Sequence, residues 1–266
     1  MRNLFIPSML SLFFVLASFH PVGLRSFKVT KVVIDPGHGG SDPGTLGKYT
    51  KEKDVALKVA LKVGEYINKN IPEVEVIYTR KDDSSVDLKR RPEIANEHDA
   101  DLFISIHANS LPKSTPFSRK KQIKGAEVYV MGAQNTDRAL EVAQRENSVI
   151  LQEQDYEDKY DFNPQSEESY ILFSLTQSSY QDNSLLLASL IDDQLTERAG
   201  RKSYGVKQSS LYVMWSTAMP SVLVEIGYLS NPEEEKELND PGVQAYIASG
   251  IYRAVKEYKE AFDAQN

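Results

Sequence analysis

Two histidines of this chain stand where a run of apolar residues gives way to a polar loop. His38 lies in VVIDPGHGGSDPG (residues 32–44), and His107 ends LFISIH (residues 102–107). His98 differs, because it lies in the polar stretch ANEHDAD and is expected at the solvent surface. Neutral imidazole is a good zinc donor, so His38 and His107 would form part of a metal site if the fold brought them together.

Two carboxylates are candidates to complete such a site. Glu52 begins a predicted helix, where a carboxylate also has a simpler explanation, since it favours the positive end of the helix. Glu225 nearly ends the apolar stretch SVLVEI, where a buried carboxylate is costly without a partner. Two histidines and one glutamate leave the fourth position of a tetrahedral zinc ion open for water.

The elements that must position these residues alternate along the chain. Hydrophobic patterns predict strands over residues 29–34, 74–79, 102–107, 126–131 and 221–226. They predict helices over residues 52–68, 88–97 and 184–199, and a last helix from Pro241 to about residue 262 with Asp240 as its N-cap. This order predicts an α/β fold, a single domain with a mostly parallel twisted sheet flanked by helices. Ligands of such sheets bind beyond the carboxyl ends of the strands, so His38, His107 and Glu225 are expected on one rim.

Residues 132–183 are polar, acidic and only partly periodic. Some fifty residues are more than a crossover in a compact α/β domain requires. We therefore expect a helical insertion there.

Composition limits the class of protein. Hydrophobic residues make up 41% of the 266 residues and charged residues 26%, as in ordinary globular chains. The formal net charge of −7 disfavours nucleic acid as a partner. Arg2 and the apolar run Leu4–Phe19 predict a secretory signal peptide over residues 1–24, with a retained membrane anchor as the alternative. The remainder, residues 25–266, is then an exported domain with no stable membrane span and, lacking cysteine, no disulfide or lipid attachment point.

Four blocks of the chain resemble a known family. VVIDPGHGGSDPG, KEKDVAL, DLFISIHANS and MPSVLVEIGYLSNPEEEKEL are similar, in this order, to the zinc-dependent N-acetylmuramoyl-L-alanine amidases of type 3. The resemblance implies that His38, Glu52 and His107 hold one Zn²⁺ and that Glu225 is the catalytic general base. It covers nearly all of residues 28–262.

The same resemblance implies a substrate and a place of action. The substrate is peptidoglycan, cut at the amide between N-acetylmuramic acid and L-alanine, so that stem peptides are released during wall remodelling and daughter-cell separation. A periplasmic monomer is expected. Two rival functions are a zinc peptidase acting on stem peptides and a non-catalytic, cell-wall-binding regulator. Structural roles are expected for four further matching residues, Asp35, Arg91, Asn109 and Asn231.

The insertion at residues 132–183 matches one that family members of the cell-separation type carry. In those family members, the helix of the insertion covers the zinc cleft until a periplasmic activator protein displaces it, and the resemblance implies the same arrangement here. In TDRALEVAQRENSVILQEQ (residues 136–154), Ala139, Val142 or Ala143, and Val149 or Ile150 could form one apolar face. Two carboxylates of this segment are candidates for the open zinc position, with Glu146 as the first choice and Glu141 as the second. The alternative is a solvated helical excursion with surface charges.

Overall fold

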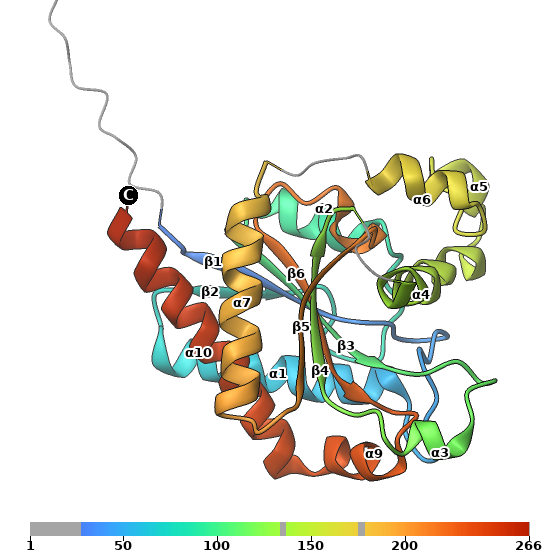
Figure 1. Cartoon of the computed structure of the whole chain (residues 1–266). Helices are drawn as coiled ribbons and strands as arrows, with labels where there is room; N and C mark the ends of the chain where they lie inside the picture. The colour runs from blue at the N-terminus through green and yellow to red at the C-terminus, as the bar shows by residue number, and fades with distance from the viewer. Residues whose placement is uncertain (1–27, 134–136, 175–178, 266) are drawn as a thin grey trace, which may run out of the picture.

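A computed structural model describes residues 28–133, 137–174 and 179–265 (Figure 1). The predicted signal peptide, residues 1–24, lies outside these residues. In the part described, six strands form one sheet in the order β2-β1-β3-β6-β4-β5. Their bounds are β1 Lys31–Pro36, β2 Glu75–Tyr78, β3 Leu102–Asn109, β4 Ala126–Met131, β5 Ser203–Ser209 and β6 Ser221–Tyr228.

The sheet is mostly parallel, as predicted. The one antiparallel pair is β4 with β6, and every other neighbouring pair among the described strands is parallel. The edge strand β5 was not predicted. Its sequence, SYGVKQS, has no apolar run, because most of its residues are only half-buried at the edge of the sheet.

One face of the sheet is covered by three long helices, α1 (Glu52–Asn70), α7 (Gln181–Glu197) and α10 (Pro241–Gln265) (Figure 1). The predicted apolar stripe of α1 is fully buried against the sheet. The short helix α9 (Pro232–Asn239) precedes α10, and the Asp240 side chain between them accepts hydrogen bonds from the backbone of Gly242 and Val243. Asp240 therefore caps α10 as predicted.

The opposite face packs against α2 (Arg90–Glu97), α8 (Tyr212–Trp215) and the insertion. Within residues 132–183 the described helical elements are α4 (Asp137–Asn147), the 3₁₀ helix η1 (Ser148–Gln152), α5 (Tyr156–Lys159), α6 (Glu167–Ser174) and the start of α7. Ala139, Val142, Ala143 and Ile150 are buried, so α4 and η1 do present an apolar face to the domain.

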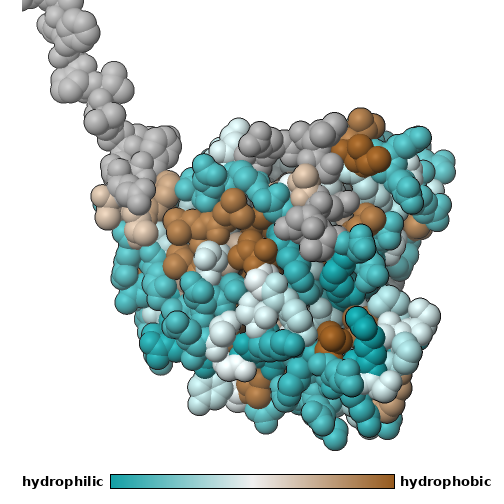
Figure 2. Space-filling view, viewed as in Figure 1, coloured by the Kyte–Doolittle hydropathy of each residue, from teal (hydrophilic) through white to brown (hydrophobic). Residues whose placement is uncertain are grey.

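The surface of α6 is partly apolar. Ile171 and Leu172 are both exposed, and Figure 2 shows a hydrophobic area where α6 lies. No helix in the described ranges is both long enough and apolar enough to cross a bilayer.

The rim at the carboxyl ends of β1, β3 and β6 is where the candidate residues gather. His107 of β3 is the register partner of Glu225 of β6, and Pro36, at the end of β1, pairs with Ile106. The loop after β1 carries His38, and the first residue of α1 is Glu52. Three neighbouring strands and one helix therefore place four candidate side chains at a single edge.

Candidate metal centre

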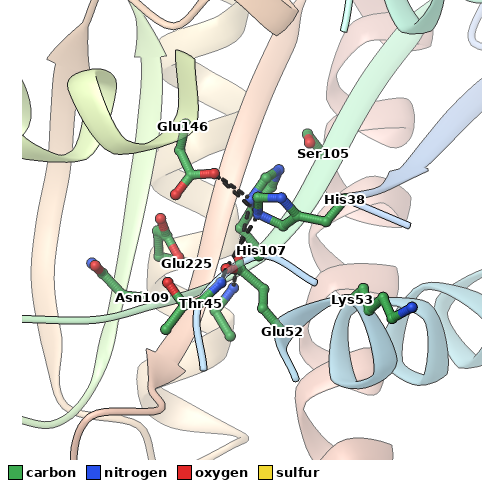
Figure 3. A network of polar contacts seen from close by, with 12 residues as sticks. His38, Thr45, Glu52, Lys53, Ser105, His107, Asn109, Glu146 and Glu225 are labelled. Atoms are coloured by element: carbon green, nitrogen blue, oxygen red, sulfur yellow. Dashed lines mark hydrogen bonds and ion pairs between the residues drawn. The ribbon is translucent and has the colours of Figure 1, made fainter. Parts of the chain in front are cut away.

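Four buried side chains bring their donor atoms to one point. They come from the β1 loop, α1, β3 and α4, and one ligand atom of each lies within 4.8 Å of all the others: His38, Glu52, His107 and Glu146 (Figure 3). Glu52 lies between the two imidazoles, at 3.2 Å from His38 Nε2 and 3.0 Å from His107 Nδ1. Glu146 repeats these distances from the other side, at 3.2 Å and 3.0 Å from the same nitrogens.

The four histidine–carboxylate separations are close to those around a tetrahedral zinc ion. Donors at zinc distances of about 2.0–2.1 Å lie about 3.3 Å apart in a tetrahedron. Two buried atoms of the cluster, His38 Nε2 and Glu146 Oε2, make no hydrogen bond, so both are available as metal donors once the imidazole is neutral. Imidazole with carboxylate is a donor set that suits zinc better than calcium or magnesium.

Neighbouring groups orient the ligands. The Asp42 carboxylate accepts the Nδ1–H of His38 at 2.6 Å, which leaves Nε2 free for a metal. Glu52 accepts backbone hydrogen bonds from Thr45 at 2.7 Å and Ala108 at 2.9 Å. Asp42 lies only four residues after His38, so its place in the same loop was a usable signal that our sequence interpretation did not draw on.

Glycines make room for this arrangement. A Cβ on Gly37 would lie 2.4 Å from Nε2 of His107, and a Cβ on Gly44 would lie 2.5 Å from the ring of His38 and 2.7 Å from Glu52. Gly44 also has a φ of +65°, which side-chain-bearing residues rarely adopt. The glycines of the opening motif thus let the loop pack directly on the two imidazoles.

Two buried arginines hold the loop that carries His38. Arg80 donates to the carbonyls of Pro36 at 3.0 Å and Gly37 at 2.7 Å. Arg91 donates to Pro36 at 2.9 Å and to His38 at 2.8 Å. Three consecutive carbonyls are therefore fixed by guanidinium groups, and His38 itself is held at a φ of +58°, a conformation that needs such support.

The charge of Arg91 is balanced below the loop. Asp35 is fully buried and accepts hydrogen bonds from Arg91, Thr79 and Ser105. Arg91 and these bonds keep the pKa of Asp35 below its ordinary value, although burial opposes them. Arg80 also donates to the carbonyl of Lys53 at 2.9 Å, so one side chain ties the His38 loop to the start of α1 beside Glu52. The structural roles expected for Asp35 and Arg91 agree with these contacts.

The catalytic candidate Glu225 lies beside the cluster and outside it. Its side chain is fully buried and its Oε1 accepts from Arg145 at 2.7 Å, while Oε2 makes no hydrogen bond. Burial, together with the charges of Glu146 and Glu52, raises the pKa of Glu225 to about 8, although Arg145 lowers it. This position suits a group that exchanges a proton with a molecule bound at the cluster.

The insertion contributes two adjacent residues to the site. Arg145 donates to Glu225, to Glu146 at 2.7 Å and to Asn109 at 2.8 Å. Our sequence analysis did not predict Arg145, although its place next to Glu146 was a signal. Glu141 is not in the cluster, because its side chain is 52% exposed and pairs with Arg138. Asn109 also donates to the buried Glu127, and Asn231 caps α9, so both have structural contacts.

The fold and this cluster define an α/β protein with the donor set of a zinc hydrolase at the carboxyl ends of its strands. A sequence model of the family described as N-acetylmuramoyl-L-alanine amidase matches residues 32–257, and the chain belongs to this family. The prediction of a peptidoglycan amidase, which cuts the amide between N-acetylmuramic acid and L-alanine, is thereby confirmed.

Individual proteins similar to this chain are also amidases. The chain is 33% identical over 237 residues to the amidase AmiA of Escherichia coli K12, covering 88% of this chain and 78% of AmiA. Its fold is similar to the catalytic domain of the amidase CwlV from Bacillus (Paenibacillus) polymyxa var. colistinus, with a TM-score of 0.62, 29% identity and coverage of 87% and 98%. It is also similar to the amidase CwlD of Clostridioides difficile, solved in complex with the GerS lipoprotein, with a TM-score of 0.61, 26% identity and coverage of 87% and 99%.

Replacing Arg91 by lysine is expected to weaken zinc binding about 10- to 100-fold, because lysine keeps the charge but cannot donate to Asp35, Pro36 and His38 together. Zinc affinity is measured by competition with a chelator, and the absorption spectrum of the cobalt-substituted protein should change. Arg90→Lys, at an exposed neighbour that pairs with Glu97, is the matched control and should leave both unchanged. Equal zinc affinity in the Arg91 and Arg90 variants would exclude a positioning role for Arg91.

Zinc binding to the metal-free protein is expected to release protons at pH 7. The Glu146 and Glu52 carboxylates raise the pKa of His107 to about 9 against the effect of burial, and that of His38 well above its ordinary value. Both imidazoles are then protonated at pH 7 and must become neutral to bind zinc, so affinity rises with pH up to about 9. Calorimetry in buffers of different ionisation enthalpy should count about two protons per zinc, and a count near zero contradicts the protonated cluster.

Proposed function

We propose that this amidase is zinc-dependent, with His38, Glu52 and His107 as the metal ligands and Glu225 as the general base. The observation that carries the proposal is the convergence of the donor atoms at 3.0–3.2 Å, with Glu225 in register with His107 on the adjacent strand. When bound, zinc polarises the scissile carbonyl and lowers the pKa of a coordinated water to about 7.

Residues of the chain then transfer the proton and orient the metal ligands. The buried carboxylate of Glu225 takes a proton from the attacking water and returns it to the nitrogen of L-alanine as the amide bond breaks. Asp42 accepts the Nδ1–H of His38, which fixes the orientation of the ring and leaves Nε2 as the donor atom toward the metal. Asn109 lies next to Glu225 and is held by Glu127.

Glu225→Gln is expected to keep zinc bound while lowering turnover by roughly two to four orders of magnitude, the usual contribution of a positioned acid–base group. His38→Ala and His107→Ala should instead lose zinc and activity together, because each removes one of three ligands. Metal content by atomic emission and turnover on purified sacculi separate the two cases. Full activity of Glu225→Gln would remove Glu225 as the base.

The products of digestion separate the proposed reaction from its two rivals. Mass analysis of digested sacculi should find free stem peptides beginning with L-alanine. A zinc peptidase would release internal peptides, and a non-catalytic regulator would release none. A chelator should abolish the release, and added zinc should restore it.

We propose further that the insertion inhibits the enzyme by two adjacent contacts. Glu146, which lies 3.2 Å from Nε2 of His38 (Figure 3), would take the fourth position of the zinc site. Arg145 forms an ion pair with Glu225, the proposed general base. Since both residues are tethered on α4, their effective concentration at the site is high, and water and substrate compete poorly with them. Arg145 and the imidazoles hold the pKa of Glu146 well below its usual range despite burial, so Glu146 is an anion suited to bind the metal.

A partner protein has to supply the free energy that moves α4 away. The helix is held by buried Ala139, Val142 and Ala143 and by Asn147, which donates to Ser210 and accepts from Tyr212. The complex of the similar CwlD with a lipoprotein supports a protein partner for this chain. The exposed apolar residues of α6, within the same insertion, offer a surface for its docking.

Glu146→Ala is expected to raise the basal turnover of the purified chain at least tenfold, because a tethered ligand is removed from the metal. Glu141→Ala, on the same helix but outside the cluster, is the matched control and should leave turnover unchanged. Turnover on purified sacculi is measured for zinc-loaded proteins of equal thermal stability. An unchanged rate in Glu146→Ala would exclude Glu146 as the inhibitory group.

The cellular setting follows from the substrate. Peptidoglycan lies outside the cytoplasm, and the apolar run Leu4–Phe19 provides an export signal, so the enzyme acts in the periplasm during daughter-cell separation. It acts as a monomer, since one chain supplies all the ligands and the base.

A further inference from the structure

A cleft of about 790 Å³ opens from the metal cluster to the surface. One lip is formed by residues 44–49, before α1, and the other by residues 110–120, which include α3 (Phe117–Lys120). Residues 229–236 form the floor between them, and α4 with η1 lines a further side. The two lips and the floor belong to the catalytic core and not to the insertion, although Arg138 and Arg145 of α4 donate hydrogen bonds to the carbonyl of Ser110 on one lip.

The acidic residues that line the cleft all have partners. Glu52 and Glu146 belong to the metal cluster, Asp42 pairs with Nδ1 of His38, and Glu141 pairs with Arg138. The carboxylate of Glu235 accepts hydrogen bonds from the backbone of Tyr49 and Thr50, which holds one lip to the floor. None of these carboxylates is therefore available to a ligand while the site is assembled.

Four lysines line the cleft without an ion pair to a carboxylate of the described residues: Lys48, Lys113, Lys120 and Lys236. Lys120 donates to the backbone carbonyl of Lys113 at 3.3 Å, and Lys48 interacts with the side chain of Tyr49. Lys113 and Lys120 share one lip, and Lys48 is on the opposite one. On a chain with a net charge of −7, the outer cleft is a cationic surface that attracts anionic ligands.

Exposed apolar side chains accompany these lysines. Leu46 (62% exposed) and Tyr49 (70%) lie on the first lip, and Phe117 (60%) lies on the second. Lys48 lies 4.9 Å from the ring centre of Tyr49. Large apolar side chains left in water around a cleft are typical of a surface that a ligand covers.

We propose that Lys48, Lys113 and Lys120 recognise the free carboxylates of the stem peptide, while Tyr49 and Phe117 pack on its backbone. This proposal rests on the proposed function, because the reacting amide must lie at the metal cluster for the rest of the stem to follow the cleft. A stem peptide carries a free carboxylate on its γ-linked glutamate and others toward its carboxyl end. The three lysines therefore make the enzyme selective for stems whose carboxylates are free over stems in which they are amidated.

Binding of the released peptide tests this without requiring turnover. The zinc-loaded full chain is titrated with L-alanyl-γ-D-glutamyl-diaminopimelate and with the same tripeptide amidated at its carboxyl groups. We expect the free acid to bind at least tenfold more tightly at low ionic strength, and the difference to shrink in 0.5 M salt because the charges are exposed. Equal affinity for the two peptides overturns the proposal.

Charge reversal identifies the residues. Lys113→Glu with Lys120→Glu should weaken binding of the free tripeptide at least tenfold and leave the amidated tripeptide within twofold. Lys58→Glu with Lys62→Glu, on α1 away from the cleft, is the matched control and should change neither affinity. Equal loss in both double variants would assign the effect to net charge and overturn the proposal.

Turnover separates this proposal from the proposed function. In a Glu146→Ala background, the lip variant should raise KM for free-acid muropeptides with kcat unchanged. An active enzyme that does not distinguish acid from amide contradicts the lysine proposal alone. A chain that releases no stem peptide yet binds the free acid preferentially contradicts the proposed function alone.

Discussion

Burying several ionisable groups at one point is costly, and in this protein the surrounding structure is arranged to balance that cost. His38, Glu52, His107 and Glu146 are all shielded from water, and each lies beside groups of opposite charge. Two imidazolium ions and two carboxylates are neutral together, and so is a zinc ion with neutral imidazoles and the same carboxylates. Withdrawing Glu146 from the zinc-loaded site leaves one net positive charge. Such a site favours an anionic transition state, so Glu146, the proposed inhibitory group, holds the place of the charge that the reaction develops.

To keep these charges at one point, the protein must hold the candidate ligands in place without the metal. The His38 loop is fixed by the hydrogen bonds of Arg80 and Arg91 to three successive carbonyls, and Asp35 forms an ion pair with Arg91 beneath the loop. Arg80 also reaches the carbonyl of Lys53, which fixes the loop relative to α1. The two ligands that come from loop and helix termini are thus as well supported as His107, which lies within the sheet. A site prepared in this way needs little reorganisation on binding metal.

The site residues that could be predicted from the sequence are those whose role follows from their immediate neighbours in the chain. Strand-to-loop transitions located His38 and His107, the apolar run before Glu225 marked a buried carboxylate, and the alternation of elements predicted the sheet. Contacts between residues far apart in the sequence could not be predicted in this way. Arg145 donates to Glu225, which is 80 positions away, and Arg80 donates to Gly37, which is 43 positions away. A lone arginine in a sequence gives no indication of its carbonyl or carboxylate partner. Strand β5 was not predicted from the sequence, because a half-buried edge strand needs no continuous apolar run.

The proposed inhibition and the proposed recognition of the stem peptide use different parts of the same cleft, and this has consequences for regulation. Arg145 and Glu146 cover the reacting centre only, whereas the cationic lips at residues 44–49 and 110–120 stay open beside them. A stem peptide held by the lips raises the local concentration of its own amide near the metal, but it cannot by itself remove two charge-assisted contacts and a buried helix face. Under the proposed inhibition, the free energy for opening comes from contacts of a partner with the insertion. Abundant substrate in the wall then leaves turnover at its low basal level until a partner binds, and that partner controls where cutting occurs.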